Sequence, residues 1–218
     1  MEKKEEKLTF SDKLGKWILK NRIVLISILS VILVVGIASA IIFSVVSKNT
    51  EKKYAEIYAL STEYVQLTEE DKEAKTTEIL DSVLNIAGKN AKNGVGIRAY
   101  MLAAEIYYQN KDYEAAAEAY KNAANANLKA YTAPLCFYNA AVCYEELGNI
   151  DAAIEYINKA NDCENFTLKA KGLFNLGRLE EQRGNTDAAI EYYNALINDF
   201  GYDQWTTLAK SRVLLLSK

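Results

Sequence analysis

Apolar residues follow two different patterns along the chain. Residues 23–46 form an unbroken apolar run of 24 residues without a charge. A helix of that length exceeds the roughly 30 Å thickness of a bilayer's hydrocarbon core. From about residue 99 onward, apolar residues recur at helical spacing in segments separated by short polar turns. The pattern predicts an all-α protein in which a single N-terminal transmembrane helix precedes a set of antiparallel helix pairs.

The apolar run also contains a sequence that resembles a signal-peptidase site. Ala38-Ser39-Ala40 has the small-x-small form of such a site. The run continues from Ile41 to Val46, however, and the preceding 22 residues hold acidic as well as basic side chains. We therefore expect an uncleaved anchor, with cleavage after Ala40 as the alternative.

Basic residues are more frequent before the apolar run than after it. Such an asymmetry predicts a cytoplasmic amino terminus and places the large carboxy-terminal part outside the cytoplasm. For a bacterial protein this corresponds to the inner membrane, with the repeat region in the periplasm. The residues counted are Lys7, Lys13, Lys16, Lys20 and Arg22 before the run, and Lys48, Lys52 and Lys53 after it.

A short amphipathic segment, from Thr9 to Lys20, precedes the apolar run. Phe10, Leu14, Trp17 and Ile18 fall on one face of the helix that this segment predicts. The helix either lies on the lipid surface or simply extends the span. The sequence leaves both interpretations open.

The remaining sequence contains an internal repeat. Three segments, which begin at Ala99, Cys136 and Gly172, superpose without gaps at periods of 37 and 36 residues. Each predicts a first helix, a short polar turn and a second helix that contains an Ala pair. Small residues allow the paired helices to approach closely, and larger ones fill the space toward the next pair. The small residues are Ala104, Ala141, Gly177, Ala116, Ala153 and Ala189, and the larger ones are Tyr120, Ile157 and Tyr193.

These residues resemble the tetratricopeptide repeat. The first copy fits the family pattern through Tyr100, Ala103-Ala104, Tyr107, Ala116, Tyr120 and Ala123, and the second through Phe137, Ala140-Ala141, Tyr144, Ala153, Ile157 and Ala160. In the third copy, Glu180 replaces a Tyr and Leu196 replaces the final Ala, and the family's proline is absent from all three. The resemblance implies an α-solenoid of stacked helix pairs.

The repeats divide the chain into four predicted regions. These are a cytoplasmic tail (1–22), the transmembrane helix (23–46), a linker helix with a degenerate first repeat (47–91), and three repeats with a terminal capping helix (97–218). The degenerate repeat would pair residues 54–67 with 72–89. The terminal helix, residues 204–216, carries Trp205, Leu208, Ala209, Val213 and Leu216 at helical spacing. Its remaining leucines serve either packing or self-association.

The family resemblance also implies a binding groove lined by the first helix of each pair. Such grooves take extended peptides or partner helices, although any single residue could equally be part of a solvated face. A clamp for a terminal carboxylate is not predicted, because Met101 and Glu105 stand where basic or amide groups are needed. The groove residues are Arg98, Met101, Glu105, Tyr108, Tyr138, Asn139, Val142, Glu145, Lys171, Phe174, Asn175 and Arg178.

Composition narrows the functional class. The 218 residues include no histidine, one proline and three cysteines. Triad chemistry, His-containing zinc sites and four-thiolate zinc sites are therefore excluded. We expect no enzyme, cofactor or metal site. The net charge of −3 divides into +3 for residues 1–22 and −6 for residues 47–218, which disfavours nucleic acid as a partner.

Cysteine placement bears on the compartment. Cys136 and Cys143 are seven residues apart on one predicted helix, which is too far for a disulfide. With Cys163 they are expected to be buried apolar residues. Three free thiols argue against an oxidising compartment.

An anchored, outward-facing repeat region resembles bacterial inner-membrane tetratricopeptide proteins that accompany the translocation channel. The sequence therefore predicts a membrane-anchored scaffold that binds proteins or extended peptides and assists translocation or envelope assembly. The alternatives are a cytosol-facing receptor for protein import and a structural protein that forms homo-oligomers through its C-terminal helix.

Overall fold

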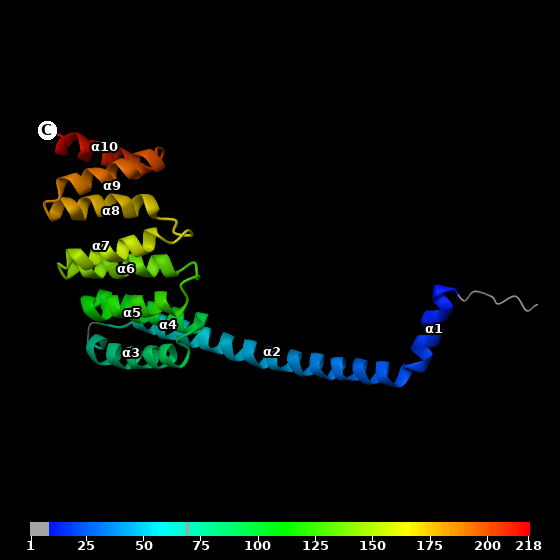
Figure 1. Cartoon of the computed structure of the whole chain (residues 1–218). Coiled ribbons are helices and arrows are strands. Elements are labelled where there is room, and N and C mark those ends of the chain that lie inside the picture. Colours follow the sequence, from blue (N-terminus) through cyan, green and yellow to red (C-terminus); the bar gives the residue numbers. More distant parts are fainter. Residues whose placement is uncertain (1–8, 69) are drawn as a thin grey trace, which may run out of the picture. The chain divides into compact units, whose positions relative to one another are not determined.

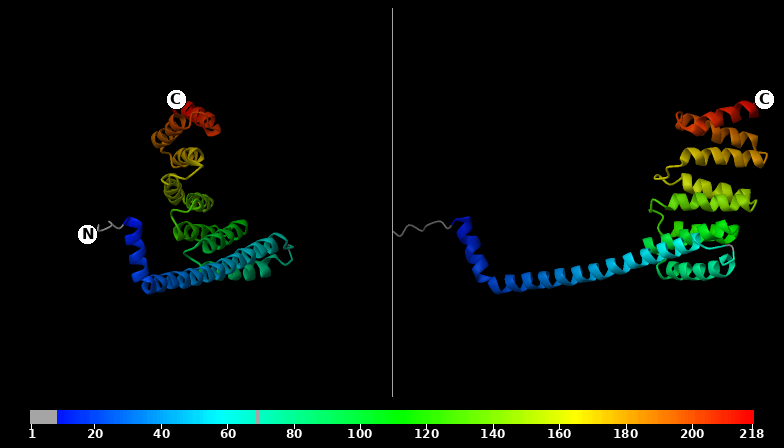
Figure 2. Two further views of the ribbon diagram at one scale, coloured as in Figure 1. Left: turned by 90° about the vertical axis from the view of Figure 1, so that its right-hand side faces the viewer. Right: turned by 180° about the vertical axis from the view of Figure 1, so that it is seen from behind.

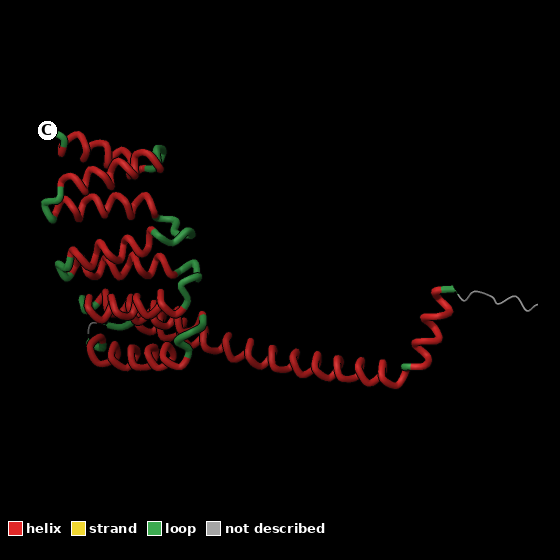
Figure 3. The backbone as a smooth tube through the Cα atoms, in the orientation of Figure 1, coloured by secondary structure: helices red, strands yellow, loops and turns green. Residues whose placement is uncertain are grey.

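The computed structural model describes residues 9–68 and 70–218. The first eight residues of the predicted tail, which include Lys7, and residue 69 lie outside this range. The predicted all-α fold is confirmed, because the regular structure in the described part of the chain is helical and contains no strand (Figure 3). The helices are α1 (Phe10–Lys20), α2 (Arg22–Val65), α3 (Lys72–Lys89), α4 (Gly94–Gln109), α5 (Tyr113–Ala126), α6 (Ala133–Glu146), α7 (Ile150–Asn161), α8 (Lys169–Gln182), α9 (Thr186–Asp199) and α10 (Gln204–Leu216).

The chain divides into two units at residue 52. In the first unit, α2 is long and apolar enough to cross a bilayer, a property that membrane spans share with signal sequences. No side chain in its most apolar stretch is buried. The helix continues unbroken through Ala38–Ala40.

In the second unit, α3 to α10 stack in sequence order (Figures 1 and 2). The helices α4 and α5, α6 and α7, and α8 and α9 form the three pairs, and α10 packs on α9. Ile57 and Tyr64, near the end of α2, are buried in the same core as α3 and α4. This arrangement is an α-solenoid, in which each helix pair covers the apolar face of the next.

The turn inside each pair has the same backbone conformation. Its second residue is left-handed in all three repeats, with φ of 63° at Lys111, 72° at Gly148 and 82° at Gly184. The next amide donates back to the first helix, as from Asn149 to the carbonyl of Tyr144 at 2.9 Å. This pattern satisfies carbonyl groups that the end of a helix leaves unpaired. Two of the three repeats use glycine there, because a residue without Cβ adopts positive φ at little cost.

Close helix approach depends on the small residues that the sequence indicates. Ala104, Ala116, Ala153 and Ala189 are fully buried. In the third repeat, Gly177 faces the buried ring of Tyr193, and a Cβ at this position would lie 2.5 Å from a ring carbon. The lack of a Cβ at Gly177 is therefore what lets the Tyr193 ring fit between α8 and α9.

Two details differ from the sequence prediction. Cys136 and Cys143 are buried, but Cys163 is only partly covered, because it follows the end of α7. Its thiol donates to the Lys159 carbonyl at 3.3 Å. Leu208 is 49% exposed, so it does not belong to the inward stripe of α10.

Candidate functional site

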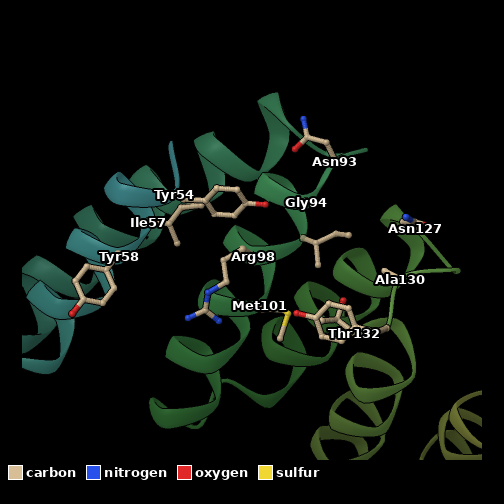
Figure 4. A pocket seen from close by; sticks show the side chains of 12 residues that line it. Tyr54, Ile57, Tyr58, Asn93, Gly94, Arg98, Met101, Asn127, Ala130 and Thr132 are labelled. Atoms are coloured by element: carbon tan, nitrogen blue, oxygen red, sulfur yellow. The ribbon is translucent and has the colours of Figure 1, made fainter. Parts of the chain in front are cut away.

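The second unit contains a cleft of about 660 Å³ between its first helices. Tyr54, Ile57 and Tyr58 of α2 form one side of the cleft (Figure 4). The start of α4 forms another side, and the loop between α5 and α6 closes the third. The lining residues from these two elements are Asn93, Gly94, Ile97, Arg98, Met101, Asn127, Ala130, Tyr131 and Thr132.

The lining of the cleft combines exposed aromatic rings with buried apolar side chains. Tyr58 is 76% exposed and Tyr131 is 84% exposed, whereas Ile57 and Ile97 are buried. Exposed tyrosine rings supply a large contact area and a hydroxyl at a small entropic cost. A surface of this kind suits an apolar side chain of a peptide.

Local structure fixes the shape of the cleft at the start of α4. The Asn93 side chain caps this helix by accepting from the amide of Val95 at 2.9 Å. The hydroxyl of Tyr54 lies so close to Gly94 that a Cβ there would be 2.6 Å from it. Gly94 therefore leaves room for the Tyr54 ring against the helix terminus.

The predicted groove residues of the first repeat lie partly in this cleft. Arg98 and Met101 line it, whereas Glu105 and Tyr108 do not. The Arg98 guanidinium lies 3.7 Å from the carboxylate of Glu105, and both side chains are nearly half exposed. Tyr108 packs edge-on against Tyr113, with 5.3 Å between ring centroids, and its burial raises the pKa of its phenol.

The predicted groove residues of the second and third repeats contact each other. Arg178 donates to Glu145 at 2.7 Å. Asn175 donates to the hydroxyl of Tyr138 at 2.5 Å, and the ammonium of Lys171 lies 5.3 Å from the centroid of the Tyr138 ring. These contacts join α6 to α8 across the repeat boundary. The polar groups of these residues, which the sequence predicts to contact a ligand, therefore contact each other.

Tyr138, one of the twelve predicted groove residues, is buried. Only 4% of it is exposed, because its ring packs on Phe166 with 5.9 Å between centroids. Burial also raises the pKa of its phenol to about 12. Phe174 is partly covered and contacts Tyr193 and Trp205. Asn139 and Val142 are partly buried.

Sequence reasoning missed most of the cleft. The repeat pattern begins at Ala99, so it gives no register for Tyr54 and Tyr58, which precede it. Tyr131 lies in a loop, to which the pattern assigns no face. Its large aromatic side chain among polar and small residues is the signal that could have indicated an exposed contact.

The lining of the cleft combines tyrosine, isoleucine and methionine side chains with polar groups. In the described part of the chain, no three Cys, Asp or Glu side chains come together in a way that could hold a metal ion. The one cationic group in the lining is Arg98. The fold and the cleft thus define a helical-repeat scaffold of the protein-binding class.

Comparison with known proteins identifies the family. A model of the tetratricopeptide repeat-like domain family matches residues 16–213, so the chain belongs to that family. Its members are generally non-enzymatic scaffolds for protein–protein interaction. The match begins before the apolar run and therefore includes it.

Individual relatives are distant. The chain is 26% identical over 119 residues to a TPR repeat-containing protein of Treponema pallidum (strain Nichols), a match that covers 55% of this chain and 50% of that protein. The chain thus spans about half the length of this curated relative.

Among solved structures, TPR-like repeats of a Podosopora anserina putative kinesin light chain superpose with a TM-score of 0.51 at 11% identity, over 74% of this chain and 84% of that one. MamA gives a TM-score of 0.48 at 17% identity, over 72% and 85% of the two chains. At this identity the first likeness concerns the fold alone.

Proposed function

We propose that this protein is a non-enzymatic, membrane-anchored scaffold that binds extended protein chains in the cleft beside α2 and assists their translocation or assembly in the bacterial envelope. The observation that carries the proposal is the cleft itself, whose lining combines exposed Tyr58 and Tyr131 with buried Ile57 and Ile97. Its aromatic, methionine and arginine side chains are types enriched at protein interfaces.

The anchor is the apolar part of α2. Its side chains lie open, as at Leu33, which is 64% exposed. Exposed apolar surface on that scale is unstable in water and needs lipid around it. The apolar run continues for six residues past Ala40, and the family match includes this segment; both observations support retention of the anchor over cleavage.

The proposed orientation places the repeats in the periplasm of a bacterial inner membrane. The excess of basic residues before the span supports it. The buried state of two of the three thiols also fits an oxidising compartment, since burial raises the pKa of Cys136 and Cys143 to about 12. Thiols kept protonated in this way react slowly.

Few residues separate the apolar run from the first cleft residue. Tyr54 follows Val46, the last residue of the apolar run, by eight residues. Even a fully extended segment of that length reaches less than about 30 Å.

Two membrane assays test the anchor and its orientation. Full-length protein in native membranes should resist alkaline carbonate extraction, and protease added to the periplasmic side should cleave the repeat region. Release by carbonate would contradict the anchor. Cleavage only from the cytoplasmic side would contradict the orientation and favour the import-receptor alternative.

A binding assay tests the cleft. A fluorescent, permanently unfolded periplasmic protein is titrated with the full chain in neutral detergent. Replacing Tyr58 and Tyr131 together by Ala should weaken binding by about tenfold or more, because aromatic anchors dominate such interfaces. Tyr202→Ala is the matched control, because Tyr202 is fully exposed in the turn before α10. Equal affinities for all variants would place binding outside the cleft.

A further inference from the structure

The helix α1 has no buried residue and carries an apolar stripe. Phe10, Leu14 and Trp17 recur at intervals of four and three residues, so they share one face of the helix. Phe10 is 82% exposed and Trp17 is 55% exposed. Three large apolar side chains on one exposed face need a partner that removes them from water.

A stripe of positive charge runs beside the apolar stripe. Lys13, Lys16 and Lys20 are three and four residues apart, and Lys13 and Lys20 flank Trp17 at helical spacing. The one acidic residue of α1, Asp12, is at its start. Its carboxylate accepts from the Thr9 amide at 3.0 Å, and the hydrogen bonds from Thr9 lower the pKa of Asp12. The single negative charge is therefore engaged in the helix cap, away from the last two lysines.

Both ends of α1 have hydrogen-bond caps formed by residues outside α2. Thr9 and Asp12 form a reciprocal capping box at the first turn. At the other end, the backbone amide of Asn21 and its side-chain amide both donate to the carbonyl of Trp17, at 3.1 and 2.8 Å. The backbone carbonyl of Asn21 accepts from the amide of Leu25, in the first turn of α2, at 3.0 Å. Hence α1 is a separate helix, and the chain turns at Asn21.

We propose that α1 lies flat on an anionic lipid surface, with Phe10, Leu14 and Trp17 in the interfacial layer and Lys13, Lys16 and Lys20 on lipid headgroups. The assignment rests on the proposed anchor, which brings α1 to the bilayer. Tryptophan favours the depth of the headgroups, and lysines beside it extend their ammonium groups to the same level. The occupant of the apolar face is thus lipid, selected by the positive stripe.

A set of single-tryptophan variants tests the orientation of α1. In the Trp205→Phe background, which keeps an aromatic ring against Phe174, Trp17 is the remaining tryptophan. Two further variants also carry Trp17→Phe. One of them places its single tryptophan at position 10 through Phe10→Trp, and the other places it at position 19 through Leu19→Trp. Position 19 is two residues, or about 200° of helix rotation, from position 17.

Quenching by brominated lipid reports the depth of each tryptophan. The full-length variants are reconstituted in vesicles of neutral and anionic phosphatidyl lipids brominated near the headgroup. If α1 lies flat, positions 10 and 17 are quenched alike and position 19 is quenched less. An upright helix that extends the span gives the opposite order, strongest at 19 and weakest at 10, because positions 10 and 17 then differ in height by about 10 Å.

The outcomes distinguish failure of the proposal for α1 from failure of the proposed anchor. The flat order supports the proposal even if carbonate extracts the chain, a result that would refute only the anchor. The upright order in an extraction-resistant chain refutes the proposal and leaves the anchor intact. Weak quenching at all three positions with blue-shifted emission indicates a protein partner for α1 and also refutes it. A chain that fails to bind vesicles refutes both.

Lipid charge is tested separately. At equal mole fraction, brominated phosphatidylglycerol should quench Trp17 more than brominated phosphatidylcholine, because each basic residue enriches anionic lipid by up to about fivefold. Replacing Lys13, Lys16 and Lys20 by Gln should reduce the difference while position 17 stays quenched. An unchanged difference in the triple variant would contradict the role of the lysines.

Discussion

The guanidinium of Arg178 on α8 donates to the carboxylate of Glu145 on α6, with 2.7 Å between Nη2 and Oε2. The two residues belong to successive repeats, so this hydrogen-bonded ion pair crosses the repeat boundary. The interaction raises the pKa of Arg178. The side chains of Arg178 and Glu145 are each about one-third exposed to solvent, so solvent screens part of the attraction between their charges.

The Arg178–Glu145 pair should contribute modestly to stability. We expect a coupling of about 0.5 to 1 kcal/mol in a double-mutant cycle with Arg178→Gln and Glu145→Gln. The measurement is denaturant unfolding of the full chain in neutral detergent. Lys159 and Glu155, four residues apart on α7, are the control, with about 0.3 to 0.5 kcal/mol expected. A coupling no larger than that of the control would show that the pair does not join the repeats.

Substitution of Gly177 should be far more damaging. In Gly177→Ala the new methyl group meets the fully buried ring of Tyr193, so α8 and α9 must separate or the ring must move. We expect the free energy of unfolding to fall by about 1 to 3 kcal/mol. Gly88→Ala on α3, whose Cβ would have no neighbour within 4 Å, should leave stability unchanged or slightly higher. If the two variants have equal stability, the close approach of the helices is not required.

The three thiols should differ in reactivity. Burial raises the pKa of Cys136 and Cys143 to about 12, which leaves a thiolate fraction of about 10⁻⁴ near pH 8. We expect iodoacetamide to modify Cys163 in the native chain and all three residues after unfolding, as measured by mass spectrometry. Rapid native modification of Cys136 would show that the core opens at the second repeat.

The same two thiols make stability depend on pH in the alkaline range. Their folded pKa lies above the value of roughly 8.5 for a free thiol, so the folded chain holds these protons more tightly. Their contribution is complete below about pH 8.5, and the free energy of unfolding should decline as pH rises from there toward 12. Denaturant unfolding across this range measures the decline, which Cys143→Ala should reduce. A decline of the same size in that variant would assign the effect to other groups, such as the buried tyrosines.

The terminal helix offers a test of the self-association alternative. Leu214 and Leu215 are 67% and 56% exposed on α10. If these side chains form a homo-oligomer contact, Leu214→Asp should shift a concentration-dependent dimer to monomer in sedimentation experiments in detergent. A wild-type chain that is monomeric at all concentrations would eliminate this alternative.

The sequence predicts the fold better than it predicts the binding surface. Small residues such as Ala104 and Ala153 repeat at a fixed period, and their period alone implies the stacked helix pairs. The period does not reveal contacts that arise only when the pairs stack. The family resemblance assigns Tyr138 and Arg178 to a binding groove, whereas in the folded chain Tyr138 accepts a hydrogen bond from Asn175 and Arg178 pairs with Glu145.

Irregular segments account for the remaining difference. Tyr131 belongs to the loop between α5 and α6, where side-chain direction follows from the path of the backbone rather than from periodicity. Tyr58 belongs to a first repeat too degenerate to set a register. The cleft combines residues of both kinds, and it becomes evident only when the helices are placed in space.

Crosslinking in native membranes shows which proteins occupy the cleft. A photoreactive phenylalanine analogue replaces Tyr58 or Tyr131 in the cleft, or Tyr202 as the control, in cells that export envelope proteins. We expect adducts with newly exported chains or translocation components from positions 58 and 131, and none from 202. Adducts with cytosolic proteins alone, or the same adducts from all three positions, would contradict the proposed function.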